Sequence, residues 1–346
     1  MGRSVAERDR EKPPVALTEY ADLHGCSCKL GQSDLVGLLE KTGLNTDRDE
    51  LVFGVGEDAA ARKVTDDLAI VSTIDYFTPI IDDPYEYGRV AVTNAASDAY
   101  AKGATEQLSF MVVLGVPKEI TEYAINILSG IVDAVADMEG VVVGGHTVIN
   151  PWPLAGAAVN AVATPESLVT TREASPGNVL YLTKPLGTQP AMGALRVKDG
   201  EFGDQVQEAT DRDIEAIGAD ALKWMETPNR DAAKAFESAP VTASTDITGF
   251  GLRGQSKQVA NNSGVGLEIT HIPVVGGTAP LSKMFGYGLL DGDSAETSGG
   301  LLMAVESDGA ADLEAELEAR DVFYREVGRV VPGEGVTIDD PTIEEI

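Results

Sequence analysis

The stretch LAIVSTIDYFTPI (68–80), followed by DDPYEYGRVAVTNAASDAYAKGA (82–104), decides the fold class. The first part is apolar and β-branched, which predicts a strand with Asp75 near its C-terminal end. The second part begins with a proline, is rich in alanine and stops at Gly103, which predicts a helix. A strand that leads directly into a helix is the repeating unit of an α/β protein.

The same alternation continues on both sides of this unit. A helix is predicted over 33–44, and further elements follow to about residue 170: strands at 108–117, 141–146 and 154–165 and a helix at 119–140. The strand at 141–146 is expected to run into a glycine turn. These elements predict one compact α/β unit.

A boundary is predicted within TREASPGNVLYLTKPLG (171–187), where serine, proline and glycine precede a new strand. A second α/β set follows, with helices over 191–240 and strands at 239–245, 298–305 and 322–331. We therefore expect a flexible tail at 1–16, an N-terminal domain at 17–172 and a C-terminal domain at 173–346.

The charge balance excludes one class of partner. The 346 residues include 56 acidic and 26 basic ones, a formal charge of −30. Such a surface repels a phosphate backbone, so nucleic acid is not expected as the main partner. No segment reads as a membrane span or a secretory signal, which predicts a soluble cytoplasmic protein with no membrane partner. The dispersed acidity is typical of a salt-rich (halophilic) cytoplasm, and an ordinary acidic mesophile is the alternative.

The only two cysteines, Cys26 and Cys28, lie in LHGCSCKLGQ (23–32). Two cysteines at this spacing cannot form a disulfide scaffold for a chain of this size. A structural zinc site needs four ligands, and only three histidines could complete it: His24, His146 and His271. The pattern favours a redox or nucleophilic thiol over structural zinc.

Four aspartates stand at loops or element ends among small or hydroxyl residues: Asp58, Asp75, Asp98 and Asp246. Any one of them alone is typical of solvated surface. Asn94 and Asp98, however, share one face of the predicted helix with alanines around them, which indicates a semi-buried polar site. Magnesium prefers carboxylates together with water and phosphate oxygens, so converging aspartates could hold a nucleotide triphosphate through metal ions.

The sequence has no standard P-loop, so a nucleotide would be held by metals, by Lys29 and by backbone amides such as those of GGHT (144–147). GFGLRG (249–254) matches a dinucleotide motif, with Glu268 in the position of the acidic residue. A polar insertion before the first glycine weakens that match. A tight turn that brings backbone close to a ligand or a helix is the simpler interpretation.

HGCSCK (24–29) resembles the N-terminal motif of the selenophosphate synthetases. Further stretches fall in that family's order, and the resemblance covers about residues 17–335: GEDAA, STIDYFTPIIDDPYEYGRVAVTNAASDAYAKGA, VVGGHT, LTKPLG, STDITGFGLRG and TSGGLL. These are shared with a superfamily that includes aminoimidazole ribonucleotide synthetase, thiamine-monophosphate kinase and a hydrogenase-maturation dehydratase. The N-terminal C-x-C-K distinguishes the selenophosphate synthetases from those relatives.

The resemblance implies that ATP, selenide and water become selenophosphate, AMP and phosphate, with Mg²⁺ as cofactor. It implies Cys26 and Lys29 as catalytic residues and Cys28 as a less needed second cysteine. It implies three metal ligands: Asp58, Asp98 and Asp246. The implied nucleotide site consists of Lys29, Asp75, Asn94, Asp98, Gly144, Gly145 and His146, with the last three reached from a partner subunit.

The implied fold is that of aminoimidazole ribonucleotide synthetase. Its N-terminal α/β domain binds ATP and metal and pairs in a homodimer through a shared β-barrel, beside an α+β C-terminal domain. The loop at 23–32 would be a catalytic lid that swings on Gly25 and Gly31, with Lys29 lowering the pKa of Cys26. A protein that delivers selenium is a further implied partner.

Three features depart from the family pattern. Ser27 replaces a glycine, DSAE (293–296) replaces Asp-Pro-Gln, and the loop at 276–296 is altered and shortened. Two alternatives stay open: a related ATP-dependent kinase or synthetase acting on another substrate, and a selenium- or metal-binding protein without turnover.

Overall fold

The computed structural model of the chain describes residues 15–29, 37–39, 41–42 and 48–346. Residues 37–39 and 41–42 are helical, as the predicted helix over 33–44 requires. The rest of that helix, Gly31 and the tail before residue 15 lie outside the described residues.

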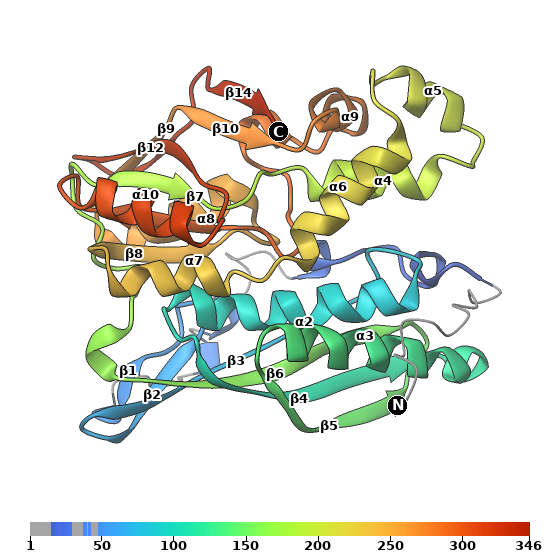
Figure 1. The fold of residues 1–346 in the computed structure, drawn as a ribbon. Helices are drawn as coiled ribbons and strands as arrows, with labels where there is room; N and C mark the ends of the chain where they lie inside the picture. The colour runs from blue at the N-terminus through green and yellow to red at the C-terminus, as the bar shows by residue number, and fades with distance from the viewer. Residues whose placement is uncertain (1–14, 30–36, 40, 43–47) are drawn as a thin grey trace.

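The N-terminal half is built on a six-stranded sheet of order β1-β2-β3-β6-β4-β5 (Figure 1). Its strands are β1 (Leu51–Phe53), β2 (Ala60–Thr65), β3 (Leu68–Phe77), β4 (Glu106–Val116), β5 (Val141–Ile149) and β6 (Leu154–Ala163). Neighbouring strands are antiparallel except β4 and β5, which run parallel and are joined through a helix.

Two helices cover one face of this sheet, α2 (Pro84–Ala101) and α3 (Ala124–Asp137). Asp83 caps α2, its carboxylate accepting from two backbone amides of the first turn, and Pro84 follows it. The helices lie very close: a Cβ on Gly88 would meet the carbonyl of Ile127 at 2.1 Å, and one on Gly130 that of Tyr85 at 1.9 Å. Only glycine permits this approach.

The C-terminal half contains a second six-stranded sheet, of order β13-β9-β12-β7-β11-β8, and a separate parallel pair, β10-β14. Its strands are β7 (Val179–Leu182), β8 (Val241–Asp246), β9 (Gly266–Ile269), β10 (His271–Val274), β11 (Leu301–Val305), β12 (Arg325–Val331), β13 (Gly335–Thr337) and β14 (Thr342–Glu345). Its helices are α4 (Thr188–Val197), α5 (Gly203–Glu208), α6 (Ile214–Glu226), α7 (Arg230–Lys234), α8 (Gly251–Ser263), α9 (Thr278–Phe285) and α10 (Ala310–Ala319).

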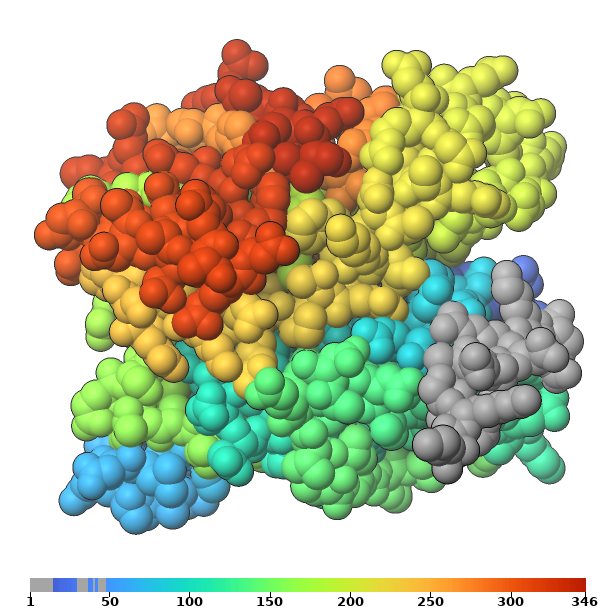
Figure 2. Space-filling view, in the orientation of Figure 1, coloured from blue at the N-terminus to red at the C-terminus, as the bar shows by residue number. Residues whose placement is uncertain are grey.

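Helix α2 lies between the two halves. One side of it packs on β3 and β6 of the N-terminal sheet, and the other contacts α6, α7 and β8. In Figure 2 the blue-to-green N-terminal residues form the lower part of the surface and the yellow-to-red residues the upper part. The two halves therefore meet along a helix that belongs to the first of them.

The expected alternation of strands and helices is confirmed, with two corrections. The helix expected over 119–140 begins with a 3₁₀ segment, Lys118–Tyr123, and α3 starts only at Ala124. β5 does not run into a turn at Gly144 and Gly145. It continues as a strand to Ile149, because Gly144 to Ile149 pair in parallel with Met111 to Val116. Of the described residues, no helix is both long and apolar enough to cross a membrane.

Candidate active site: a buried cysteine beside an acidic cluster

The first of the two cysteines lies in the interior of the molecule. Cys26 begins a single turn of 3₁₀ helix, Cys26–Cys28, and its side chain is fully buried. The turn starts at Gly25, which has φ +56° and donates its N–H to the carbonyl of Thr78. A Cβ on Gly25 would lie 2.4 Å from Thr297 Oγ1. Both the backbone conformation and the lack of space require glycine here.

Cys26 is held by both halves of the chain. Its Sγ donates to Asn94 Oδ1 at 3.2 Å, and its backbone N–H donates to Thr297 Oγ1 at 3.2 Å. Asn94 Oδ1 also accepts the N–H of Ser298 at 2.8 Å. Ser298 has φ +52°, so the turn at Thr297 and Ser298 is itself constrained. The C-terminal half thus contributes directly to the position of the cysteine.

Lys29 pairs with Asp75 rather than with the thiol. Its Nζ lies 2.8 Å from Asp75 Oδ2, the oxygen that also accepts from Asn94 Nδ2 at 2.6 Å. Burial lowers the pKa of Lys29 while the Asp75 carboxylate raises it, and the resulting pKa lies well above the usual value. Lys29 is therefore a firmly protonated cation at the edge of the site.

This arrangement corrects the expectation that Lys29 makes Cys26 a ready thiolate. Burial raises the pKa of the Cys26 thiol strongly, and the nearby ammonium of Lys29 offsets only part of that effect. The sequence showed the adjacent charge but not the burial. In this conformation Cys26 is a protonated thiol that donates to Asn94.

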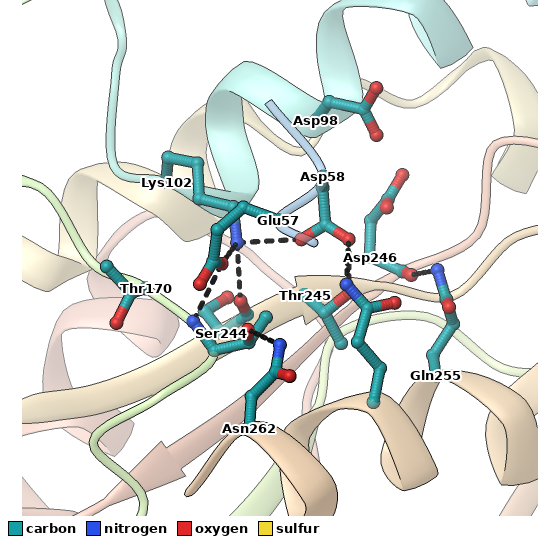
Figure 3. Close-up of polar contacts among 12 residues, drawn as sticks. Glu57, Asp58, Asp98, Lys102, Thr170, Ser244, Thr245, Asp246, Gln255 and Asn262 are labelled. Carbon is teal, nitrogen blue, oxygen red and sulfur yellow. Dashed lines mark hydrogen bonds and ion pairs between the residues drawn. The ribbon is translucent and has the colours of Figure 1, made fainter. Parts of the chain in front are cut away.

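The four predicted aspartates lie around one region. Asp58 lies in the short segment between β1 and β2, Asp98 is on α2, and Asp75 and Asp246 lie within the last residues of β3 and β8. Both side-chain oxygens of Asp246 are buried and meet no hydrogen-bond donor among the described residues. Thr73 Oγ1 donates to Asp98 at 2.5 Å. Figure 3 shows Asp58, Asp98 and Asp246 facing the same space.

Burial and mutual repulsion among these carboxylates raise the pKa values of two of them. Burial, with the carboxylates of Asp246 and Asp75, raises the pKa of Asp98 well above its usual range. Burial and Asp58 raise the pKa of Asp246 to about 6. Asp75 pairs with Lys29 and Asp58 with Lys102, but Asp98 and Asp246 form no ion pair among the described residues, which indicates a site for a positive ligand beside these two.

The carboxylate oxygens of this group fit magnesium chemically, but their spacing limits how many of them one ion could reach. Carboxylate oxygens without donors are the ligands that Mg²⁺ prefers. However, no three His, Cys, Asp or Glu side chains among the described residues surround a single point closely enough to hold an ion alone. An ion bound here would take one or two carboxylates and complete its shell with phosphate oxygens and water.

A buried ion-pair cluster next to Asp58 was not predicted. Lys102 Nζ lies 2.9 Å from Glu57 and 2.8 Å from Asp58, and it donates to the Ser244 carbonyl at 3.2 Å (Figure 3). The Lys102 side chain is fully buried. Thr245 Oγ1 fixes the other oxygen of Asp58 at 2.9 Å. Because Lys102 follows Asp98 by one helical turn, the sequence could have indicated that the two lie on the same face of the helix.

A second missed feature supports the turn at Thr297. Glu296 is buried and accepts three hydrogen bonds from the start of α4: from Gly187 N at 2.8 Å, Thr188 N at 2.8 Å and Thr188 Oγ1 at 2.5 Å. Thr188 Oγ1 in turn accepts the N–H of Thr297 at 3.1 Å. Glu296 ends the DSAE segment that departs from the family pattern, so the departure lies in the support of the cysteine loop.

The first glycine of GFGLRG lies against the backbone of Cys26. A Cβ on Gly249 would lie 2.5 Å from the carbonyl oxygen of Cys26, and Gly251 has φ +66°. Glu268 lies within β9, where it pairs with Arg329 at 2.8 Å. These contacts agree with a tight turn that lets backbone approach closely and give no support to a dinucleotide motif.

Gly144, Gly145 and His146 are not brought to the cluster within one chain. They lie on the edge strand β5, which is separated from β3 by β4 and β6. All nine residues of β5 are exposed. A contribution from these residues therefore needs a second copy of the chain.

Two family models match this chain in succession. Residues 56–164 match the AIR synthase related protein N-terminal domain, and residues 175–340 match the AIR synthase related protein C-terminal domain. The two matches fall on either side of the predicted boundary at 172, which stays a prediction.

Curated relatives match over nearly the whole length. The selenide, water dikinase of Methanocaldococcus jannaschii is 40% identical, covering 96% of this chain and 97% of that protein. The selenide, water dikinase of Methanococcus maripaludis is 38% identical, covering 89% and 94%. Among solved structures, AaThiL complexed with AMPPCP and TMP superposes with a TM-score of 0.68 at 21% identity, covering 91% and 95%. That likeness establishes the fold.

Proposed function

Because this chain belongs to the selenide, water dikinase family, we propose that it makes selenophosphate from selenide, water and ATP, releasing AMP and orthophosphate. The family relationship rests on 40% identity over nearly all of both chains. The observation that carries the proposal to this chain is the contact of Cys26 with Asn94, beside Asp75 and Lys29. The Cys26 thiol and the Asp75 carboxylate thus both contact Asn94, and Lys29 pairs with that carboxylate.

Nucleotide binding is proposed at the space faced by Asp58, Asp98 and Asp246. Magnesium bound there would neutralise charge on the phosphates as they are transferred. Asp246, whose oxygens have no donors, and Asp98 would be the first ligands, while Lys102 limits the role of Asp58 by pairing with it. A bound cation would favour the ionised forms of Asp98 and Asp246. The solved AaThiL structure holds AMPPCP, an analogue of ATP, which supports a nucleotide at this fold's site.

Lys29 is proposed to exchange partners during the cycle. It pairs with Asp75 in this structure. Phosphate oxygens of a bound nucleotide would compete for its ammonium, and Asp75 would then be left as a carboxylate close to Asn94 and the Cys26 thiol. That change places a proton acceptor near the sulfur only once the nucleotide is bound. The buried thiol is thereby protected from reaction in the empty enzyme.

We propose that the enzyme is a homodimer that closes a β-barrel across the uncovered face of the N-terminal sheet. This face carries exposed apolar side chains, among them Ile74, Tyr76 and Met111, and β5 adds an unpaired edge. Large apolar patches of this kind mark contact surfaces. Pairing there would bring Gly144, Gly145 and His146 of one copy to the nucleotide of the other.

The remaining expectations concern the location of the enzyme, its supply of selenium and its relation to nucleic acid. We propose a cytoplasmic enzyme that receives selenium from a delivery protein and does not use nucleic acid as a partner. The formal charge of −30 argues against nucleic acid and favours a salt-rich cytoplasm. The runner-up function is that of a related ATP-dependent kinase with another substrate.

The proposal is tested by measuring AMP formation from ATP with magnesium at high potassium, anaerobically, with and without selenide. Selenide-dependent AMP that is abolished in Cys26→Ser and in Lys29→Ala supports it. ADP as the sole product, or turnover that ignores selenide, would assign the chain to the runner-up function. Binding of selenium without turnover would make it a carrier.

A further inference from the structure

A cavity of about 550 Å³ lies in the C-terminal half, behind the turn that holds Cys26. It is lined by the end of β7, by α6 and the start of α7, and by the chain from the end of α10 to β12. Figure 2 shows the yellow residues of α6 and α7 beside the orange residues of α10 in the upper part of the surface. None of the predicted site residues lines this cavity.

Its floor is a buried lysine without a counter-ion. Lys184 is 2% exposed, and its Nζ donates to the carbonyls of Thr227 at 2.6 Å and Ser298 at 2.8 Å. No carboxylate among the described residues forms an ion pair with it, and an ammonium has a third proton to donate. Burial lowers the pKa of Lys184 to about 7, which reflects the cost of holding this charge without an anion.

The walls supply two further cations, Lys223 and Arg320, and an aromatic surface from Trp224 and Phe323. Arg320 pairs through Nη2 with Glu316 at 3.2 Å, while its Nε is buried without a hydrogen-bond acceptor among the described residues. Trp224 and Phe323 meet edge to face, with ring centroids 5.3 Å apart. Cations together with aromatic rings are the groups that hold phosphate and a stacked base.

Carboxylates in the lining restrict the kind of anion that could bind. Asp231, Glu318 and Asp321 also line the cavity. They would repel a simple polyanion but accept hydrogen bonds from hydroxyl or amino groups. The lining, with both cations and carboxylates, therefore fits a molecule that carries one phosphate together with hydrogen-bond donors. The volume also exceeds that of a bare phosphate ion.

We propose that this cavity is a second, non-catalytic binding site for a phosphate-bearing small molecule of the nucleoside monophosphate class, with the phosphate on Lys184 and Arg320. In part this inference rests on the proposed function, because AMP and orthophosphate would be its products. The site reaches the catalytic turn: Lys184 donates to the carbonyl of Ser298, and the N–H of Ser298 donates to Asn94 beside Cys26. Occupancy would thus act on the position of the thiol as product inhibition.

The two tryptophans allow a direct test. Trp224 lies in the cavity and Trp152 does not, so Trp152→Phe leaves one fluorescent reporter at the site. The Trp152→Phe protein is titrated with AMP, orthophosphate and adenosine, without magnesium or selenide, so that no turnover is involved. We expect a saturable change with AMP and none with adenosine. Arg320→Ala should weaken AMP binding about tenfold, the worth of one charged hydrogen bond.

Matched variants separate this site from the catalytic one. Arg329→Ala, which removes an exposed arginine on β12, should leave the affinity unchanged. Lys184→Met should weaken binding as Arg320→Ala does. A response to orthophosphate equal to that of AMP would assign the site to the inorganic product. The proposal is overturned if neither ligand alters the fluorescence, or if Lys29→Ala abolishes the response while Arg320→Ala retains it.

Discussion

At the scale of single residues, Asn94 connects the thiol to the charged groups. Its amide accepts from Cys26 Sγ and the Ser298 N–H and donates to Asp75. We expect Asn94→Leu, which keeps the shape and removes these bonds, to lower selenide-dependent AMP formation by about 10²-fold, the usual cost of misplacing reacting groups by about 1 Å. Asn261→Leu on the exposed surface of α8 is the control. A rate equal to that of the unchanged protein would rule out this role.

Lys102 is expected to stabilise the fold more than any surface ion pair. Lys102→Met leaves Asp58 buried without its cation and Glu57 paired with Arg172 alone, which should lower the free energy of unfolding by about 3 to 5 kcal/mol in urea. Lys118→Met, at an exposed position, should change it little. Adding Glu57→Gln to Lys102→Met should recover part of the loss. Equal stability of Lys102→Met and the unchanged protein would contradict this account.

Much of the site could be predicted where the signal was local. Asn94 and Asp98 were placed together because residues four apart share a helix face. The turn at Thr297, the support from Glu296 and the pairing of Lys29 with Asp75 depend on contacts between distant segments, which a single sequence does not show. Burial raises the pKa of Cys26 by more than Lys29 lowers it, and the sequence showed the neighbouring charge but not the burial.

At the scale of elements, Glu296 joins the N-terminus of α4 to the turn that holds Cys26. We expect Glu296→Ala to loosen this turn, so that Cys26 reacts faster with iodoacetamide while Cys28 reacts as before. In Glu296→Gln, which keeps an acceptor oxygen, the rate of Cys26 labelling should lie between the rates in Glu296→Ala and in the unchanged protein. No change in the labelling of Cys26 in Glu296→Ala would show that Thr297 is held without it.

The same residue gives the fold a pH dependence. Burial raises the pKa of Glu296 to about 7, against the three hydrogen bonds donated to it. Because this folded pKa lies above the unfolded one, its contribution to stability is complete at acid pH and is lost as pH rises from about 4.5 through about 7. The free energy of unfolding should fall less steeply over that window in Glu296→Gln. Identical slopes in urea titrations would contradict the assignment.

Strand β5 is expected to build the dimer. Val143 is 58% exposed on this edge. In the proposed homodimer, Val143→Asp should give a monomer in sedimentation and abolish AMP formation, because the proposed contact of His146 with the partner's nucleotide would be lost. Val132→Asp on α3, at a position 52% exposed, is the matched control and should remain dimeric. An unchanged protein that sediments as an active monomer would exclude the shared barrel.

Element types were predictable where periodicity was strong, as in β3 and α2. The glycines of β5 were misread as a turn, because glycine usually interrupts a strand and only the register with β4 shows that it does not. The long helix expected over 119–140 begins instead with a 3₁₀ segment, Lys118–Tyr123, because Ile120 departs from helical geometry. Both errors lie where long-range pairing or local geometry overrides residue preference.

At the scale of the whole molecule, the charge of −30 should make stability depend on salt. Screening lengths shrink from about 10 Å at 0.1 M to about 3 Å at 1 M, so self-repulsion weakens over that range. We expect the melting temperature to rise steadily as KCl is raised to molar levels. Sucrose at matched osmolality serves as the control for a general exclusion effect. A flat or falling melting temperature would favour the ordinary mesophilic origin.

Helix α2 has a consequence for how such chains can be recombined. It is encoded in the first half, but it packs on the N-terminal sheet with one side and on α6, α7 and β8 with the other, and it carries Asn94, Asp98 and the residues that lead to Lys102. A chimera that joins this N-terminal half to the C-terminal half of a relative would inherit a helix shaped for a different neighbour. The two halves are therefore not expected to be interchangeable modules, because each presents a surface fitted to the other across α2.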